Sequence, residues 1–176
     1  NESWDLFNKI RALPVEKVTP GSSPGNVASS LAVLGHSVGL LTAVGDDDNG
    51  QVYRQRIIDY GMADYSQIVD EGKNAFVHVL ITPRERTFFS YGGCTEKISF
   101  ESTIPDAKLV YCSGYEVRMF GDRLIEYISN SSAKICFDIA APNIIEKGSS
   151  GFEAMKDRAS ILFASADEYK SLYGEH

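Results

Sequence analysis

The stretch from Gly21 to Ser30, which reads GSSPGNVASS, is the part of the sequence best suited to hold a small polar ligand. Small residues let a ligand approach the backbone, and the free N–H groups and dipole of a following helix favour hydroxyls, carboxylates or phosphates. Asn26 adds an amide that can donate and accept hydrogen bonds. The stretch is not a Walker loop, because no Gly-Lys-Ser/Thr follows, and it does not match the GxGxxG fingerprint. Alternatively, Asn26 only caps the helix.

A second polar turn, residues 45–50, contains three consecutive aspartates, Asp46 to Asp48. The preceding residues, 38–44, form a continuous apolar run that predicts a buried strand. Ligands of open α/β sheets bind at the carboxyl ends of the strands, which is where this turn would lie. The carboxylates could hold a metal ion. Alternatively, the turn is only acidic and Asp48 or Asn49 caps the next helix.

The elements that must position these turns follow an alternating pattern. Helices are predicted from apolar residues at helical spacing and from capping and glycine stop signals, and strands from short apolar runs. Strands separated by helices indicate βαβ units and a parallel sheet. The predicted strands are residues 38–44, 109–112, 134–139 and 160–164, and the predicted helices are residues 26–34, 50–60, 122–129, 151–158 and 166–173.

The middle of the chain has a different pattern. Residues 75–82 and 86–91 predict two strands, and the turn Thr82-Pro83-Arg84-Glu85 joins them with proline at a turn position. No helix fits between them, so they are predicted to form an antiparallel hairpin beside the parallel sheet. The predicted fold class is therefore α/β, with a mainly parallel sheet flanked by helices and a small additional β-sheet.

The composition of the 176-residue chain excludes several classes of protein. A hydrophobic content of 43% is that of a globular domain, and a net charge of −7 without a basic run argues against a nucleic-acid partner. The longest apolar run is too short to span a membrane, and no signal peptide is visible. Three cysteines without CxxC spacing argue against a zinc site and favour a reducing, cytoplasmic location.

Several motifs together resemble the ribokinase-like (PfkB) family of sugar and nucleoside kinases. The first signature of that family has a Gly-Gly turn, a following Asn, a helix that ends in Gly, and a strand that ends in Gly-Asp-Asp-x-x-Gly. This chain has Ser22 in place of the second glycine of the turn. The matching residues are Gly21, Asn26, Gly35 and the run Val44-Gly45-Asp46-Asp47, closed by Gly50.

Further segments extend the resemblance over nearly the whole chain, as a partial kinase domain covering residues 1–176. The hairpin, with lid strands around residues 75–100, looks like the β-lid of the family. Its Glu-Arg-Thr sequence and the stretch from Asp138 to Glu168 look most like the adenosine-kinase-like branch. Residues 109–115 resemble the strand and turn beside the substrate, and residues 138–143 and 161–168 resemble segments ahead of the nucleotide site.

The resemblance implies a phosphotransferase that uses ATP and Mg²⁺, acts on the hydroxymethyl group of a small-molecule sugar or nucleoside, and forms a homodimer through the lid. Glu168 would position Mg²⁺ through water, with no direct metal ligand. Ser165 stands where the family has Asn, and Ser165-x-x-Glu168 is also a capping-box pattern. The implied substrate-binding residues are Gly21, Ser22, Asn26, Asp47, Phe89, Tyr91, Ser113 and Tyr115, with Ser165 and Glu168 on the nucleotide and magnesium side.

Two parts of the family pattern have no counterpart in this sequence. The Gly-Ala-Gly-Asp signature, whose Asp is the catalytic base, does not occur, so the base is expected beyond residue 176. The first strand, with its substrate-binding Asp, is also missing, and we interpret the chain as a fragment of a longer kinase. The alternatives are a ribokinase- or fructokinase-type sugar kinase, or a catalytically silent relative that binds a ligand.

Overall fold

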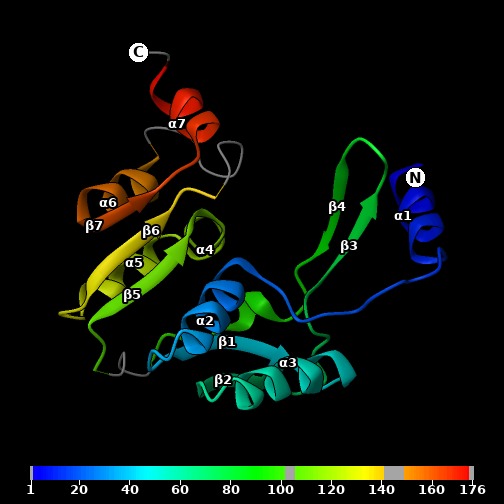
Figure 1. Cartoon of the computed structure of the whole chain (residues 1–176), viewed down its shortest axis with the longest axis horizontal. Coiled ribbons are helices and arrows are strands. Elements are labelled where there is room, and N and C mark those ends of the chain that lie inside the picture. Colours follow the sequence, from blue (N-terminus) through cyan, green and yellow to red (C-terminus); the bar gives the residue numbers. More distant parts are fainter. Residues whose placement is uncertain (1, 102–105, 141–148, 175–176) are drawn as a thin grey trace. The chain divides into compact units, whose positions relative to one another are not determined.

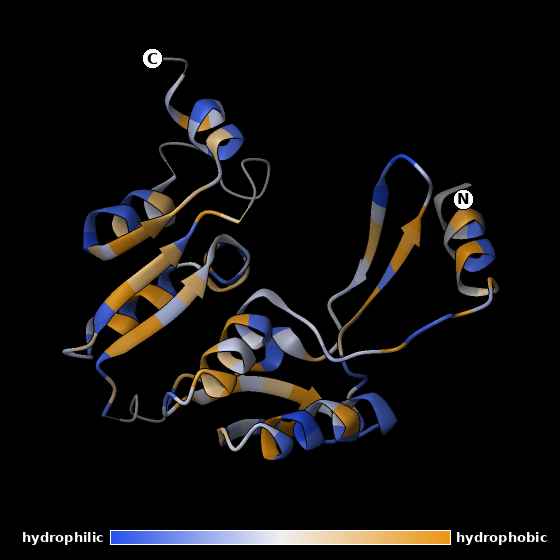
Figure 2. Ribbon diagram, viewed as in Figure 1, coloured by the Kyte–Doolittle hydropathy of each residue, from blue (hydrophilic) through white to orange (hydrophobic). Residues whose placement is uncertain are grey.

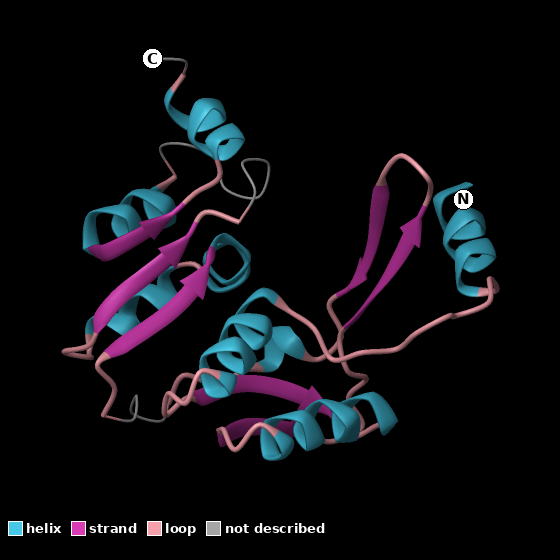
Figure 3. Ribbon diagram, in the orientation of Figure 1, coloured by secondary structure: helices cyan, strands magenta, loops and turns pink. Residues whose placement is uncertain are grey.

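The computed structural model describes residues 2–101, 106–140 and 149–174, which fold into two compact units (Figure 1). The first unit is Asn1–Ile98 and the second is Ser99–His176. Each unit has its own strands, helices and buried core (Figure 3).

The first unit contains a parallel strand pair and an antiparallel hairpin. Its elements in chain order are α1 (Glu2–Arg11), α2 (Ser23–Val33), β1 (Gly39–Gly45), α3 (Asp48–Asp59), β2 (Ala63–Val69), β3 (Phe76–Ile81), β4 (Arg86–Tyr91) and a short 3-10 helix, η1 (Thr95–Lys97). β1 and β2 pair in parallel, and β3 and β4 pair antiparallel. In the hairpin Phe76 lies opposite Tyr91 and Ile81 opposite Arg86.

The core of the first unit lies where α2 and α3 pack on β1. Its buried residues come from both helices, the strand and the segment after α3, and they are Ala28, Leu40, Ile57 and Met62. Small side chains on α2, such as Ala28, let that helix approach the strand closely. The core therefore fixes the starts of α2 and α3, where the two polar turns lie.

The apolar spacing of α3 predicts that Val52, Tyr53, Ile57 and Tyr60 all point inward, but the stripe that the structure buries is narrower. Ile57 is fully buried, and Tyr53, one turn earlier, packs against the same cluster. Val52 and Tyr60, which the spacing also predicts to point inward, are exposed by 49% and 43%. The inward prediction is wrong for these two because only the stripe through Tyr53 and Ile57 faces the core.

The second unit is a three-stranded parallel sheet with helices. Its elements are β5 (Leu109–Ser113), α4 (Gly114–Phe120), α5 (Asp122–Ser129), β6 (Lys134–Asp138), α6 (Ser150–Arg158), β7 (Ala159–Phe163) and α7 (Ala166–Tyr173). The strand order is β5-β6-β7, with Leu109 opposite Lys134 and Ser113 opposite Asp138. The largest fully buried side chains of this unit are Phe137, Ile139, Phe152 and Met155.

The predicted fold class is confirmed, because parallel strands alternate with helices and the hairpin is antiparallel. The sequence patterns do not predict α1, β2 or α4. Helix α2 begins at Ser23 rather than at residue 26, and the strands of the hairpin end at Tyr91. The remaining predicted elements are found within two residues of their predicted ends.

Candidate functional site

The glycine- and serine-rich turn leads into α2 through Ser22. The backbone N–H of Gly25 donates to Ser22 Oγ at 3.0 Å, so Ser22 is the N-cap of the helix. Pro24 is placed in the first turn, where its missing N–H does no harm. The alternative interpretation of Asn26 as the cap is therefore wrong, because Asn26 lies inside the helix and its own N–H donates to the Ser22 carbonyl at 3.0 Å.

Ser22 has a backbone conformation that normally belongs to glycine. Its φ is 72° and its ψ is 152°, a region that side chains with a Cβ rarely adopt. Its hydroxyl lies 3.0 Å from the hydroxyl of Tyr53 on α3, and the Tyr53 hydroxyl donates to the Gly21 carbonyl at 3.4 Å. The serine that replaces the second glycine of the signature thus keeps a glycine-like backbone, and α3 holds the turn in place.

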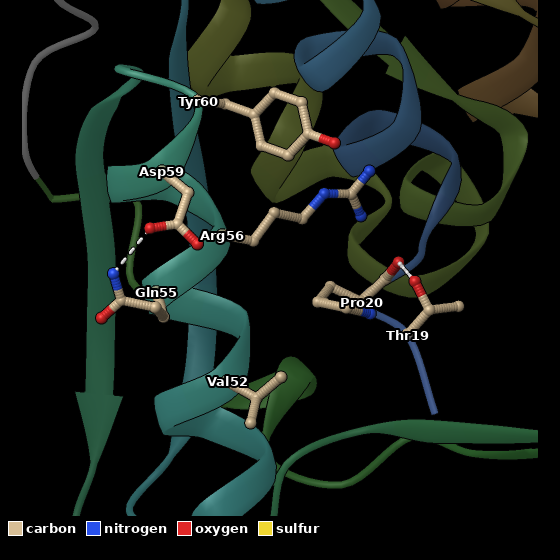
Figure 4. A pocket seen from close by; sticks show the side chains of 7 residues that line it. All are labelled: Thr19, Pro20, Val52, Gln55, Arg56, Asp59 and Tyr60. Atoms are coloured by element: carbon tan, nitrogen blue, oxygen red, sulfur yellow. Dashed lines mark hydrogen bonds between the residues drawn. The ribbon is translucent and has the colours of Figure 1, made fainter. Parts of the chain in front are cut away.

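Asn26 is exposed, and among the described residues its side chain hydrogen-bonds to α3. Asn26 Oδ1 accepts a hydrogen bond from Arg56 Nη2 at 3.3 Å. The amide nitrogen of Asn26, which carries two donors, makes no hydrogen bond to the described residues. Arg56 also lines a pocket of about 350 Å³ (Figure 4), whose other lining residues are Thr19, Pro20, Val52, Gln55, Asp59 and Tyr60.

The acidic turn is organised by Asp47. Asp47 Oδ1 accepts from Gly50 N at 2.9 Å and caps α3, so the prediction of Asp48 or Asn49 as the cap is wrong. Asp47 Oδ2 accepts from Asn74 N at 3.0 Å. A Cβ on Gly50 would lie 1.9 Å from the Gly45 carbonyl oxygen, which explains the glycine spacing of this motif. Among the described residues, no group of three or more His, Cys, Asp and Glu side chains could hold a metal ion.

Phe89 and Tyr91 lie on one face of the hairpin. Phe89 is opposite His78 and Tyr91 is opposite Phe76, and the rings of Phe76 and Tyr91 stack with centroids 5.0 Å apart. The Phe76 ring also meets the His78 ring edge-on at 5.1 Å. The hairpin therefore presents a continuous aromatic face that includes both predicted residues, and Phe76 and His78 also contribute to it.

In the second unit, Ser113 and Tyr115 lie where β5 leads into α4. Ser113 is fully buried, and both its N–H and its hydroxyl donate to Glu116 Oε2 at 2.7 Å. Tyr115 is exposed by 46%. Asp138, at the end of the neighbouring strand β6, accepts from the Tyr111 hydroxyl at 2.8 Å. The Ser113-to-Glu116 pair is a capping box that the sequence analysis missed, although the S-x-x-E pattern there could have revealed it.

Glu116 gives the second unit a pH-dependent stability that can be measured. Burial raises the pKa of Glu116 above its ordinary value of 4.5, and the nearby Asp138 acts in the same direction. A raised pKa means that the folded state binds more protons, so the free energy of unfolding falls as the pH rises through the folded pKa. Glu116→Gln keeps an acceptor for Ser113 and cannot ionise. We expect the variant to gain stability relative to the wild type as the pH rises from 4.5 to neutral.

The measurement is urea unfolding of both proteins at a series of pH values. Glu126→Gln, at an exposed position of α5, is the matched control and should not change the pH dependence. Parallel stability curves for Glu116→Gln and the wild type would contradict the expected charge burial.

Ser165 and Glu168 form a capping box at the start of α7. Ser165 Oγ accepts from Glu168 N at 3.2 Å, and Glu168 Oε2 accepts from Ser165 N at 2.6 Å. The capping-box interpretation of the pair is confirmed. Oε2 of Glu168 is engaged in this way, whereas Oε1 makes no hydrogen bond to the described residues.

The fold is that of a known group of kinases. Adenosine kinase from Schistosoma mansoni, solved in complex with adenosine, matches with a TM-score of 0.85 over 98% of this chain and 54% of that chain, at 16% identity. This similarity shows a ribokinase-like α/β fold. The chain belongs to the pfkB family of carbohydrate kinases, whose profile matches residues 12–176.

Two curated relatives match the chain at higher identity. ATP-dependent ribose-1-phosphate kinase of Halopiger xanaduensis is 32% identical over 89 residues, which is 45% of this chain and 30% of that protein. The 5-dehydro-2-deoxygluconokinase of Clostridium tetani is 31% identical over 136 residues, which is 68% of this chain and 39% of that protein. The chain thus spans about a third of the length of these relatives. No helix in the described residues is long and apolar enough to cross a membrane.

Proposed function

We propose that the protein carrying this chain transfers the γ-phosphoryl group of ATP to the hydroxymethyl group of a sugar or nucleoside. The observation that supports this most is the placement of Asn26 beside the Gly21–Ser22 turn. Its amide nitrogen keeps free donors at the start of a helix, next to backbone atoms that a small ligand can approach. Family membership supplies the reaction type.

The substrate is proposed to be a nucleoside, as in adenosine kinase. The support is the fold similarity to an adenosine kinase along nearly the whole chain. The second candidate is a sugar, as in ribokinase- or fructokinase-type enzymes, and it is favoured by the names of the curated relatives, which act on ribose 1-phosphate and on a dehydrodeoxygluconate. A catalytically silent relative is the third candidate, because Ser22 and Ser165 depart from the family pattern.

The residues of this chain would bind and enclose the substrate. Gly21, Ser22 and Asn26 would hold its hydroxyls, and the face with Phe89 and Tyr91 would cover it and exclude water. Phosphoryl transfer depends mainly on such positioning and on charge stabilisation. The base that removes the hydroxyl proton is proposed to lie outside this chain, which has no Gly-Ala-Gly-Asp. With ATP and Mg²⁺ bound, the unengaged oxygen of Glu168 would contact the hydrated cation.

The test is a panel of nucleosides and sugars on the full-length protein, read first as thermal shifts and then as ADP release. A ligand at 100 times its Kd stabilises the folded state by about 2.7 kcal/mol, so substrates should stand out clearly. Release of ADP with adenosine but not with free sugars would favour the nucleoside, and the reverse would favour the sugar. A thermal shift without ADP release would favour the silent relative. The absence of both a thermal shift and ADP release would contradict the proposal.

A homodimer through the lid hairpin is proposed from the face opposite to Phe89 and Tyr91. This face carries four exposed apolar side chains, namely Val77, Val79, Ile81 and Phe88, which are 51%, 44%, 70% and 59% exposed. The hydrophobic residues of β3 give its ribbon the orange stretches in Figure 2. A second copy of the hairpin would remove them from water. We expect Ile81→Lys to shift the full-length protein from dimer to monomer in sedimentation velocity. Gln51→Lys, on the exposed side of α3, controls for the added charge, and a monomeric wild type would contradict the proposal.

We propose a cytoplasmic location because the three cysteines are free and not paired in disulfides. Cys94, Cys112 and Cys136 are all buried as free thiols. Burial raises the pKa of Cys112 to about 12, which keeps this thiol protonated and unreactive. Free buried thiols are usual in reducing compartments.

A further inference from the structure

The two ends of the lid hairpin meet at one point, which we call the lid root and define as residues 72–75 and 92–94. Cys94 N donates to the Lys73 carbonyl at 2.9 Å, so the segments that enter and leave the hairpin lie side by side. Asn74 and Cys94 are 9% and 2% exposed, although the hairpin strands themselves are largely exposed. The lid root is therefore the packed part of the lid.

Asn74 attaches the lid root to the carboxyl end of β1. Its side-chain Oδ1 accepts from Gly45 N at 3.2 Å, and its backbone N–H donates to Asp47 Oδ2 at 3.0 Å. The approach is so close that a Cβ on Gly45 would lie 2.4 Å from Asn74 N. A larger residue at position 45 would therefore push the lid root away from the strand.

Asp47 joins the lid root and α3 with one carboxylate. Oδ1 accepts from Gly50 N and fixes the start of α3, while Oδ2 accepts from Asn74 N and fixes the lid root. The neighbouring aspartates, Asp46 and Asp48, are exposed, and neither makes a hydrogen bond of this kind in the described part of the chain. Both oxygens of Asp47 are thus used by the protein itself.

We propose that Asp47 is a positioning residue and does not bind the substrate directly. Through Asn74 it holds the lid at the carboxyl end of β1. The inference deepens the proposed function and rests on it, because the lid matters only if it covers a substrate. Helix α3 also carries Tyr53, which holds the Gly21–Ser22 turn. One helix, α3, therefore contacts both elements that would enclose the ligand, the lid through its cap Asp47 and the turn through Tyr53.

Asp47→Ser tests the proposal, because serine caps a helix as well as aspartate does but has a single oxygen. The capping bond to Gly50 can survive, whereas Asn74 N loses its acceptor. We expect backbone hydrogen exchange in residues 76–91 to become roughly 10- to 100-fold faster, with exchange in residues 51–59 unchanged. In the full-length kinase, the KM for the sugar or nucleoside should rise about tenfold, with the KM for ATP unchanged.

The controls separate positioning from a general loss of structure. Asp46→Asn removes the adjacent exposed carboxylate and should change neither exchange nor kinetics. If Asp47→Ser does not fold, the same exchange measurement is made on Asp47→Asn, because its side-chain amide keeps one acceptor oxygen and loses the other. Equal acceleration in residues 51–59 and 76–91, or no acceleration, would overturn the proposal. The exchange result is independent of the substrate, so selective lid opening in a protein without kinase activity would refute the proposed function alone.

Discussion

Replacing Asn26 by serine in the full-length kinase is expected to lower kcat/KM for the sugar or nucleoside by about 5- to 150-fold. Loss of the amide leaves ligand hydroxyls unpaired in a closed site, which costs about 1–3 kcal/mol. The melting temperature should stay the same, because Asn26 is exposed, is not the helix cap, and has a helix propensity close to that of serine. Steady-state kinetics and thermal unfolding of the same preparation give the measurement.

The matched control for Asn26 is Arg56→Met. This change removes the partner that donates to Asn26 Oδ1 and leaves the asparagine in place. If Asn26 binds the substrate directly, Arg56→Met should cost much less activity than Asn26→Ser. Equal losses in the two variants would mean that Asn26 acts through Arg56, and full activity of Asn26→Ser would remove Asn26 from the substrate site.

At position 22, glycine is expected to give a more stable protein than alanine by about 1–3 kcal/mol, the usual cost of holding a residue with a Cβ in this backbone region. Both variants lose the hydroxyl that caps α2 and contacts Tyr53, so their difference isolates the backbone. Glycine ordinarily destabilises folded proteins relative to alanine. A Ser22→Gly variant that is more stable than Ser22→Ala would therefore indicate that the backbone at position 22 is strained for residues with a Cβ. The free energies of unfolding of Ser22→Gly and Ser22→Ala in urea provide the test.

Ser30 provides the matching pair of controls in the same helix. Ser30 lies inside α2 and is exposed, so Ser30→Ala should be more stable than Ser30→Gly by about 1 kcal/mol. The same order at position 22, with alanine above glycine, would show that the backbone there is not strained. The wild-type serine should lie between the two Ser22 variants or close to the glycine variant, since its cap and its bond to Tyr53 offset part of the strain.

Local signals predicted most of the fold, and the elements that they missed depend on distant partners. The strand β2, which reads ADYSQIV, has no continuous apolar run because polar residues interrupt it, and it is held by parallel pairing with β1. Helix α4 is the exception, because the Ser113-to-Glu116 capping box is a local signal for its start. The start of α2 could not be decided locally, since Ser22 and Asn26 are both good caps.

The predicted site residues can be located in the structure, but the contacts that connect them were not predicted. The turn at Gly21, the acidic turn and the aromatic lid face are all present in the structure, but their connections run through α3. Tyr53 holds the turn and Arg56 contacts Asn26. Both contacts cross between helices that are separated by a strand in the sequence, and no spacing rule within one segment could reveal them.

The narrow base of the hairpin makes it an exchangeable module. Lys73 and Cys94 are joined by a single backbone hydrogen bond, so the residues between them leave the α/β unit and return to the same place. Insertions and replacements are tolerated best where the two chain ends of a segment lie close together. Lids of other lengths and sequences could thus be grafted beyond the lid root, between Ala75 and Gly92, with Asn74 and its bonds to Gly45 and Asp47 kept. A change in substrate range could then arise by replacing one contiguous segment.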